Sequence, residues 1–318
     1  GDIMSICILQ PGMLTTVQDI GRFGYQQFGM PTAGAVDPRS AMLGNILVGN
    51  PVGAAVLECT MLGPVFCLQN DTVFAVTGGD LSPTLNGREI PSYQAIMGKA
   101  GDIVAFGSLR SGCRAYIAFS GGIDVPLVMG SRSTYLKAKL GGFDGRRLQK
   151  GDVVPIGAVE QSLDNLECRR TAREYTEHAV DTLRVVMGPQ DDAFTMRGIE
   201  TFLAENYTVT AESDRMGCRM DGPVIEHRTA ADIISDGVVC GSVQIPASGK
   251  PIIMLADHQT TGGYTKIATV ISADFRLLGQ LKAGDLVHFA AVTIEEAQEA
   301  LLAQRASLSL LEEALNRK

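Results

Sequence analysis

Apolar residues gather along the chain in short runs that are rich in β-branched and aromatic side chains. Clear examples lie at residues 72–77, 114–119 and 183–187. Short runs of this composition, separated by turn residues, are typical of strands. The 36 glycines and 13 prolines among the 318 residues supply the turns that many short strands require. The pattern therefore predicts a mainly β protein.

One short pattern, a Gly-Asp pair in front of an apolar run, recurs along the chain. It occurs at residues 99–104, 149–154 and 282–287. A Gly-Asp turn lets the chain reverse and re-enter a sheet. Its repetition favours barrels or sandwiches, and the last two copies could close two separate units. This pattern predicts structure and carries no chemistry.

The character of the chain changes between residues 158 and 181, where charged and polar side chains dominate. We interpret this segment as a linker, helical in part, between two units. The sequence then predicts an N-terminal domain at residues 4–157 and a C-terminal domain at residues 182–318.

Helical patterns are few. Asp37 stands in a capping position before Pro38, and the residues that follow continue at helical spacing. Near the end of the chain, Thr293 and Glu296 have the spacing of a capping box. The second pattern predicts a C-terminal helix that could run to about residue 316.

The charge and the cysteine pattern exclude several classes of protein. A net charge of −8 argues against a nucleic-acid partner, because phosphate binding needs a clustered positive face. No apolar run approaches the roughly 20 residues of a membrane helix, and no secretion signal is expected at the start. The seven cysteines form no CxxC pair and the four histidines show no ligand spacing. We expect no metal site, no membrane association and a reducing, cytoplasmic location.

Two polar, glycine-rich clusters in the second half are the best candidates for chemistry. They lie at residues 213–219 and 256–264, and the second follows the apolar run 251–255. A buried strand there would deliver Asp257 to the edge of a barrel or sheet, where sites tend to be built. The alternative is a pair of structural turns in which aspartate and arginine satisfy buried backbone groups.

Other polar residues could contribute to a site. Gln244 offers both donor and acceptor groups to an amide or urea-like substrate. Tyr264 and Lys266, two apart on an extended segment, would share a face and supply an aromatic lid and a positive charge. Near the N-terminus, Asp19 and Arg22 could form a buried structural pair or part of a site.

Short strings of residues along the chain match a known family. They lie at residues 15–22, 45–50, 57–58, 121–123, 130–134, 141–146, 213–217, 244–246 and 257–264. Taken together, these strings resemble the carboxyltransferase subdomain C and D family, also called the allophanate hydrolase subunit 2 or Kip antagonist family. His258 and Thr265 depart from the arginine and proline that the family resemblance leads us to expect at those positions.

The resemblance implies a pair of cyclophilin-like β-barrels and a role as an enzyme subunit that is inactive without partners. Family members of the 5-oxoprolinase type open the 5-oxoproline lactam to glutamate with ATP. They act with a Kip inhibitor-like (B-type) protein and a LamB/YcsF-like (A-type) protein. One alternative is the carboxyltransferase part of a biotin-dependent urea or guanidine carboxylase. Another is a non-catalytic antagonist of a histidine-kinase inhibitor.

The resemblance also implies a site. The candidate catalytic residues are Asp214, Arg215 and Asp257, with Arg215 on an anionic oxygen and the aspartates as bases or as groups that orient the arginine. Preorganised donors of this kind, including a turn at residues 261–263, can stabilise developing oxygen charge by several kcal/mol. We expect the N-terminal segments and the two clusters to converge. The candidate substrate-binding residues are Gln18, Asp19, Arg22, Asp37, Arg219, Gln244, Thr261, Gly262, Gly263, Tyr264 and Lys266.

Overall fold

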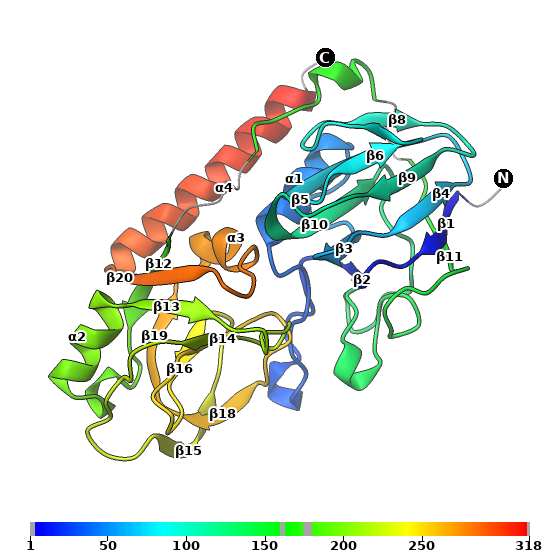
Figure 1. Cartoon of the computed structure of the whole chain (residues 1–318). Coiled ribbons are helices and arrows are strands. Elements are labelled where there is room, and N and C mark those ends of the chain that lie inside the picture. The colour runs from blue at the N-terminus through cyan, green and yellow to red at the C-terminus, as the bar shows by residue number, and fades with distance from the viewer. Residues whose placement is uncertain (1–3, 160–162, 174–179, 317–318) are drawn as a thin grey trace. The chain divides into compact units, whose positions relative to one another are not determined.

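The computed structural model describes residues 4–159, 163–173 and 180–316 (Figure 1). The chain splits into two compact units, and the second contains Phe23–Thr32 and Glu177–Ala306, with the rest in the first. Strands dominate both units, which confirms the mainly β prediction. The domain boundaries predicted at residues 157 and 182 remain a prediction.

The first unit contains two sheets around one apolar core. Residues at alternate positions of the strands, such as Ile6 and Ile8, are fully buried and pack with Phe66, Phe74 and Phe119. The six-stranded sheet has the order β11 (Val153–Pro155), β1 (Ser5–Gln10), β4 (Val65–Leu68), β9 (Ile103–Phe106), β6 (Pro83–Leu85), β7 (Arg88–Glu89). The five-stranded sheet has the order β2 (Leu14–Gln18), β3 (Val56–Thr60), β10 (Ser111–Phe119), β5 (Thr72–Asp80), β8 (Ile96–Gly98).

The helix predicted after Asp37 is present as α1 (Pro38–Leu47), beside β5 and β10 (Figure 1). It begins where the Asp37 carboxylate accepts the Ser40 backbone N–H at 3.0 Å, as an N-cap should. Its Gly44 lies so close to β5 and β10 that a Cβ there would stand 3.1 Å from the Ala118 Cβ. Close packing on the sheet therefore favours a glycine at this point.

The repeated Gly-Asp pattern forms the same turn in all three places. In the second copy the Asp152 carboxylate accepts the Gln149 N–H at 2.7 Å, and the Gly151 N–H donates to the Ile8 carbonyl at 2.7 Å. The turn thus brings the start of β11 into the sheet beside β1, which agrees with the prediction that the chain re-enters a sheet at such a turn. The glycines have positive φ angles of 90° at Gly101, 91° at Gly151 and 95° at Gly284.

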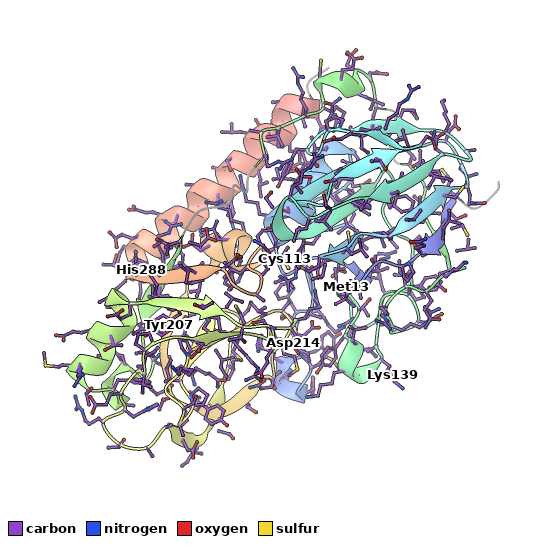
Figure 2. All side chains as sticks on the ribbon, in the orientation of Figure 1. Met13, Cys113, Lys139, Tyr207, Asp214 and His288 are labelled. Carbon is purple, nitrogen blue, oxygen red and sulfur yellow. The ribbon has the colours of Figure 1, made fainter. Side chains whose placement is uncertain are left out.

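The second unit is a closed barrel. In its core Phe289 packs against Phe202 and against Tyr207 (labelled in Figure 2), with ring centroids 4.4 and 5.8 Å apart. The closed barrel agrees with the predicted architecture. Its strand order is β12 (Asp181–Met187), β19 (Lys266–Val270), β16 (Ser242–Gln244), β17 (Ile252–Met254), β14 (Gly217–Asp221), β13 (Asn206–Val209), β20 (Leu286–Ala291).

A two-stranded ribbon stands apart from the barrel ladder. It consists of β15 (Asp232–Gly237) and β18 (Thr261–Tyr264), which pair only with each other. Besides α1 and the C-terminal helix, the described helices are α2 (Met196–Ala204), α3 (Phe275–Leu278) and the 3-10 turns Gln26–Phe28, Leu136–Ala138, Leu166–Cys168, Asp191–Ala193 and Ser272–Asp274.

The predicted C-terminal helix is α4 (Ile294–Asn316). Its capping box is formed: the Thr293 N–H donates to the Glu296 carboxylate at 2.8 Å, and the Glu296 N–H donates to Thr293 Oγ1 at 3.1 Å. Among the helices of the described residues, none is both long and apolar enough to cross a membrane.

Arg169 joins two helix ends in the first unit. Its buried guanidinium donates to the carbonyls of Ile46 and Leu47, each at 2.7 Å, and of Leu315 at 2.8 Å. The last carbonyls of a helix have no partner within the helix, so an arginine there satisfies them and complements the helix dipole. The described residues 163–173 are thereby tied to the first unit.

We predict that Arg169→Ala lowers the free energy of unfolding by about 3 kcal/mol, because three charge-assisted hydrogen bonds are lost and their carbonyls stay buried. Denaturant unfolding measures the change. The neighbouring Arg170 is exposed, so Arg170→Ala is the matched control and should change stability little. Equal effects of the two substitutions would contradict the assigned role of Arg169.

Candidate functional site

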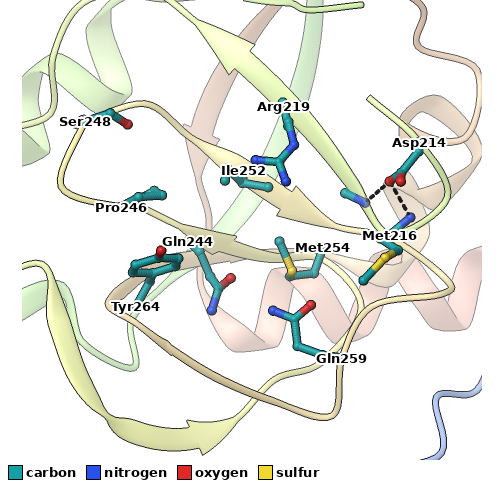
Figure 3. Close-up of a pocket in the computed structure, with 11 residues that line it drawn as sticks. Asp214, Met216, Arg219, Gln244, Pro246, Ser248, Ile252, Met254, Gln259 and Tyr264 are labelled. Carbon is teal, nitrogen blue, oxygen red and sulfur yellow. Dashed lines mark hydrogen bonds between the residues drawn. The ribbon is translucent and has the colours of Figure 1, made fainter. Parts of the chain in front are cut away.

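A cavity of about 370 Å³ lies in the second unit (Figure 3). Its lining combines one carboxylate, one guanidinium and two carboxamides with apolar side chains. The lining residues are Asp214, Met216, Gly217, Arg219, Gln244, Pro246, Ser248, Ile252, Met254, Gln259 and Tyr264.

The barrel ladder places this cavity on the outer wall. Arg219 of β14 and Gln244 of β16 are both register partners of Ile252 on β17, so these side chains stand in one row on one face. Cys218 and Ile253 are partners on the same strands, one position away, and are buried at 3% and 0% exposure. Side chains alternate along strands, so Cys218 and Ile253 point into the barrel and the cavity row points outward.

Gln244 is the most unusual residue of the lining. Its side chain is 1% exposed, yet its Nε2 has no hydrogen-bond acceptor among the described residues. Figure 3 shows the Gln244 and Gln259 carboxamides with Met254 and Tyr264 around the same space. A buried donor without an acceptor costs roughly 1–3 kcal/mol.

The ribbon strand β18 borders the Gln244 amide. A Cβ on Gly262 would stand 2.5 Å from Gln244 Nε2, so only glycine leaves room for the amide in this position. Thr261, Gly262 and Gly263, which the sequence predicts as a turn that could bind an oxyanion, form a strand instead. This strand is hydrogen-bonded to β15, so part of its backbone is already used.

The expected pairing of Tyr264 and Lys266 is not observed. Tyr264 is 41% exposed and lines the cavity, whereas Lys266 is 2% exposed and begins the barrel strand β19. The Lys266 ammonium donates to Asp236 of β15 at 2.8 Å and so fastens the ribbon to the barrel. The same hydrogen bond holds the pKa of the Asp236 carboxyl below its usual range.

Asp214 and Arg219 provide the charges at the cavity. One Asp214 carboxylate oxygen accepts the N–H groups of Met216 at 2.8 Å and Gly217 at 3.1 Å, which closes the turn before β14. Arg219 is exposed, and its guanidinium makes no hydrogen bond or ion pair with a described residue. An anionic group on a ligand could therefore reach Arg219.

Arg215 and Asp257 form a buried, two-pronged ion pair outside the lining. Arg215 Nε donates to Asp257 Oδ2 at 3.0 Å and Nη2 donates to Oδ1 at 3.1 Å, with exposures of 6% and 4%. The pair lies just beyond Gly217 and Met254, the register partners at this end of the β14–β17 ladder. There the Asp257 N–H donates to the Arg215 carbonyl at 2.9 Å. This geometry fits the structural alternative, in which the two residues hold the turn that carries Asp214.

His258, next to this pair, is also buried. Burial lowers the pKa of the imidazole below its usual value, so the ring is neutral near pH 7. Its Nδ1 lies 2.7 Å from the Gln259 carbonyl oxygen. His258 therefore supplies no positive charge to the cavity.

The N-terminal candidates belong to the first unit. Asp19 accepts hydrogen bonds from Ser131 Oγ at 2.7 Å, Ser133 Oγ at 2.5 Å and the Arg132 N–H at 2.6 Å. Arg22 is fully buried and donates to the Ser133 carbonyl at 2.9 Å. Both residues thus fix the segment around residues 131–133.

Gln18 and Asp37 also have structural partners. Gln18 Nε2 donates to Thr16 Oγ1 at 2.9 Å and to the Thr134 carbonyl at 3.2 Å, whereas its Oε1 is buried without a partner among the described residues. Asp37 caps α1. The convergence of these residues with the second unit remains a prediction.

Several lining residues were missed from the sequence. Ile252 and Met254 read as ordinary core positions of an apolar strand, and only their register with β14 shows that they face outward. Gln259 lies within one of the matching strings but carries no distinguishing signal. The other missed residues are Met216, Gly217, Pro246 and Ser248.

Comparisons with known proteins agree with this fold. Residues 28–291 match the family model described as carboxyltransferase domain, subdomain A and B. The chain is 36% identical to the C subunit of 5-oxoprolinase from Escherichia coli K12 over 293 residues, which is 92% of this chain and 93% of that protein. It is 32% identical to urea amidolyase of Saccharomyces cerevisiae over 328 residues, 97% of this chain but 18% of that protein.

A solved structure is similar over the whole chain. The structure of Kluyveromyces lactis urea carboxylase matches with a TM-score of 0.90 and 31% identity, covering 100% of this chain and 30% of that one. The fold and these matches define a carboxyltransferase-domain protein. The chain belongs to the carboxyltransferase domain family, subdomain A and B, so the family resemblance is confirmed, with the letters A and B in place of C and D.

We predict that Arg215→Lys lowers the free energy of unfolding by about 1–2 kcal/mol, because a lysine cannot keep both hydrogen bonds to Asp257. Denaturant unfolding measures stability, and the activity of the assembled enzyme is measured on the same preparation. The control is the exposed Arg228→Lys, which should change neither. A tenfold loss of activity at unchanged stability would instead make Arg215 a substrate-binding residue.

Proposed function

We propose that this chain is the substrate-binding subunit of an ATP-dependent 5-oxoprolinase, a hydrolase that opens 5-oxoproline to glutamate. The relative from Escherichia coli, similar over nearly its full length, supports this assignment. The observation that carries it is the Gln244 carboxamide, which lines the cavity and whose buried Nε2 has no acceptor among the described residues.

The other cavity residues support amide binding. Among the lining side chains, the exposed Gln259 carboxamide and the Asp214 carboxylate can accept a hydrogen bond from a lactam N–H. Met254 and Ile252 offer apolar surface to ring methylenes. In this proposal Arg215 and Asp257 position the Asp214 turn and do not themselves contact the substrate.

ATP is assigned to the assembled enzyme. A triphosphate needs several cations or free backbone N–H groups, but the lining contains Arg219 alone among cations. The N–H groups of Met216 and Gly217 are already bound by Asp214. The cavity residues therefore do not fit ATP, and the nucleotide would be held elsewhere in the complex.

The partners of this proposal are a Kip inhibitor-like (B-type) protein and a LamB/YcsF-like (A-type) protein, without which the chain would be inactive. We place the complex in the cytoplasm. The described cysteines form no disulfide bond, which supports this placement.

A second candidate is the carboxyltransferase part of a biotin-dependent urea or guanidine carboxylase. The similarity to Kluyveromyces lactis urea carboxylase over the whole chain favours it. Urea also carries a carbonyl that could accept from Gln244. Biotin would be a cofactor only in this second candidate function.

We predict that the chain, mixed with its A-type and B-type partners, releases glutamate from 5-oxoproline only when ATP is present. Omission of this chain should abolish turnover, because the lactam would lose its binding site. Glutamate is measured by a coupled dehydrogenase assay, with each partner omitted in turn as a control. Full turnover without this chain would reject the proposal, and ATP- and bicarbonate-dependent carboxylation of urea would favour the second candidate.

A further inference from the structure

We propose that Arg219 makes the cavity selective for an amide that also carries a carboxylate. This inference rests on the proposed function, because it takes the Gln244 amide as the group that binds the amide carbonyl. It assigns to Arg219 a specificity that neither the fold nor the similarity to known proteins provides.

The barrel register sets the spacing of the two groups. Arg219 and Gln244 are both partners of Ile252, one strand to either side. Adjacent strands lie about 4.8 Å apart, so the two backbones are separated by roughly 10 Å. Both side chains stand on the outer face and line one cavity, and Ile252 lies between them in the strand register. A small ring molecule fits between two such groups.

The charges fit one anionic group on the ligand. Arg219 is the single cation of the lining, and its guanidinium has no partner among the described residues. The single anion, Asp214, has one oxygen bound by two backbone N–H groups, which stabilise its charge. A planar guanidinium binds a carboxylate through two parallel hydrogen bonds, which a neutral amide cannot form.

The row of side chains matches the order of groups in a cyclic amide acid. In 5-oxoproline the lactam carbonyl and the carbon that bears the carboxylate are both bonded to the ring nitrogen, and methylenes complete the ring. The carbonyl would bind the Gln244 carboxamide, the ring would lie over Ile252, and the carboxylate would bind Arg219. Urea has no carboxylate and would leave Arg219 unused.

The test compares two probes by isothermal titration calorimetry on the full chain. One probe is 5-oxoproline, and the other is 2-pyrrolidinone, the same lactam without the carboxylate. The variants are Arg219→Gln, Arg219→Lys and Gln244→Leu. Arg197→Gln is the control, because it removes the same charge from an exposed site outside the cavity lining. Unfolding temperatures verify that each variant is folded.

The wild-type chain should bind 5-oxoproline about tenfold more tightly than 2-pyrrolidinone, which corresponds to about 1.4 kcal/mol. Arg219→Gln should abolish this preference and leave 2-pyrrolidinone binding unchanged. Arg219→Lys should keep part of the preference, and Arg197→Gln should keep all of it. Gln244→Leu should weaken both probes.

Two results would overturn the inference in distinguishable ways. If Arg219→Gln keeps the full preference while Gln244→Leu weakens both probes, the amide site stands and only the role of Arg219 fails. If the wild-type chain binds neither probe, or Gln244→Leu changes neither affinity, amide binding in the cavity fails and the role of Arg219 fails with it.

Discussion

Strand pairing between β14, β17 and β16 decides which side chains of the second unit can meet a ligand. Because side chains alternate along a strand, the register that sends Cys218 and Ile253 into the barrel core sends Arg219, Ile252 and Gln244 to its outer wall. A shift of one residue would exchange the two sets. The stability of the barrel core therefore also preserves the order of groups along the cavity.

The elements around this row keep the Gln244 amide buried beside the cavity. Lys266 fastens the ribbon to the barrel through Asp236, and Gly262 of the ribbon leaves room for the Gln244 amide. The amide is thus buried without a partner among the described residues, at an energetic cost. The buried Arg215–Asp257 ion pair stabilises the adjoining turn, which carries Asp214. Buried residues of an ion pair and residues that line the cavity lie next to one another here.

Local signals in the sequence predict the mainly β fold, the Gly-Asp turns and the capped helices, because each depends on residues close together in the chain. They also place Asp214, Arg219, Gln244 and Tyr264 in a candidate site, and these residues do line one cavity. They cannot show that Arg215 is buried in an ion pair while Arg219 is exposed at the cavity, because the exposure and the partners of a side chain depend on how the strands pair in the folded barrel. For the same reason the sequence pairs Lys266 with Tyr264, whereas the chain passes between them from the ribbon into the barrel.

NMR of the side-chain amides shows whether the Gln244 carboxamide binds a ligand carbonyl in this cavity. The Gln244 NH₂ resonances, assigned by their loss in Gln244→Leu, are followed in ¹⁵N-labelled chain during titration with 5-oxoproline. We predict a saturable downfield shift of one Gln244 amide proton, with the exposed Gln69 amide unaffected. Saturable binding of 5-oxoproline that leaves the Gln244 resonances unchanged would contradict it.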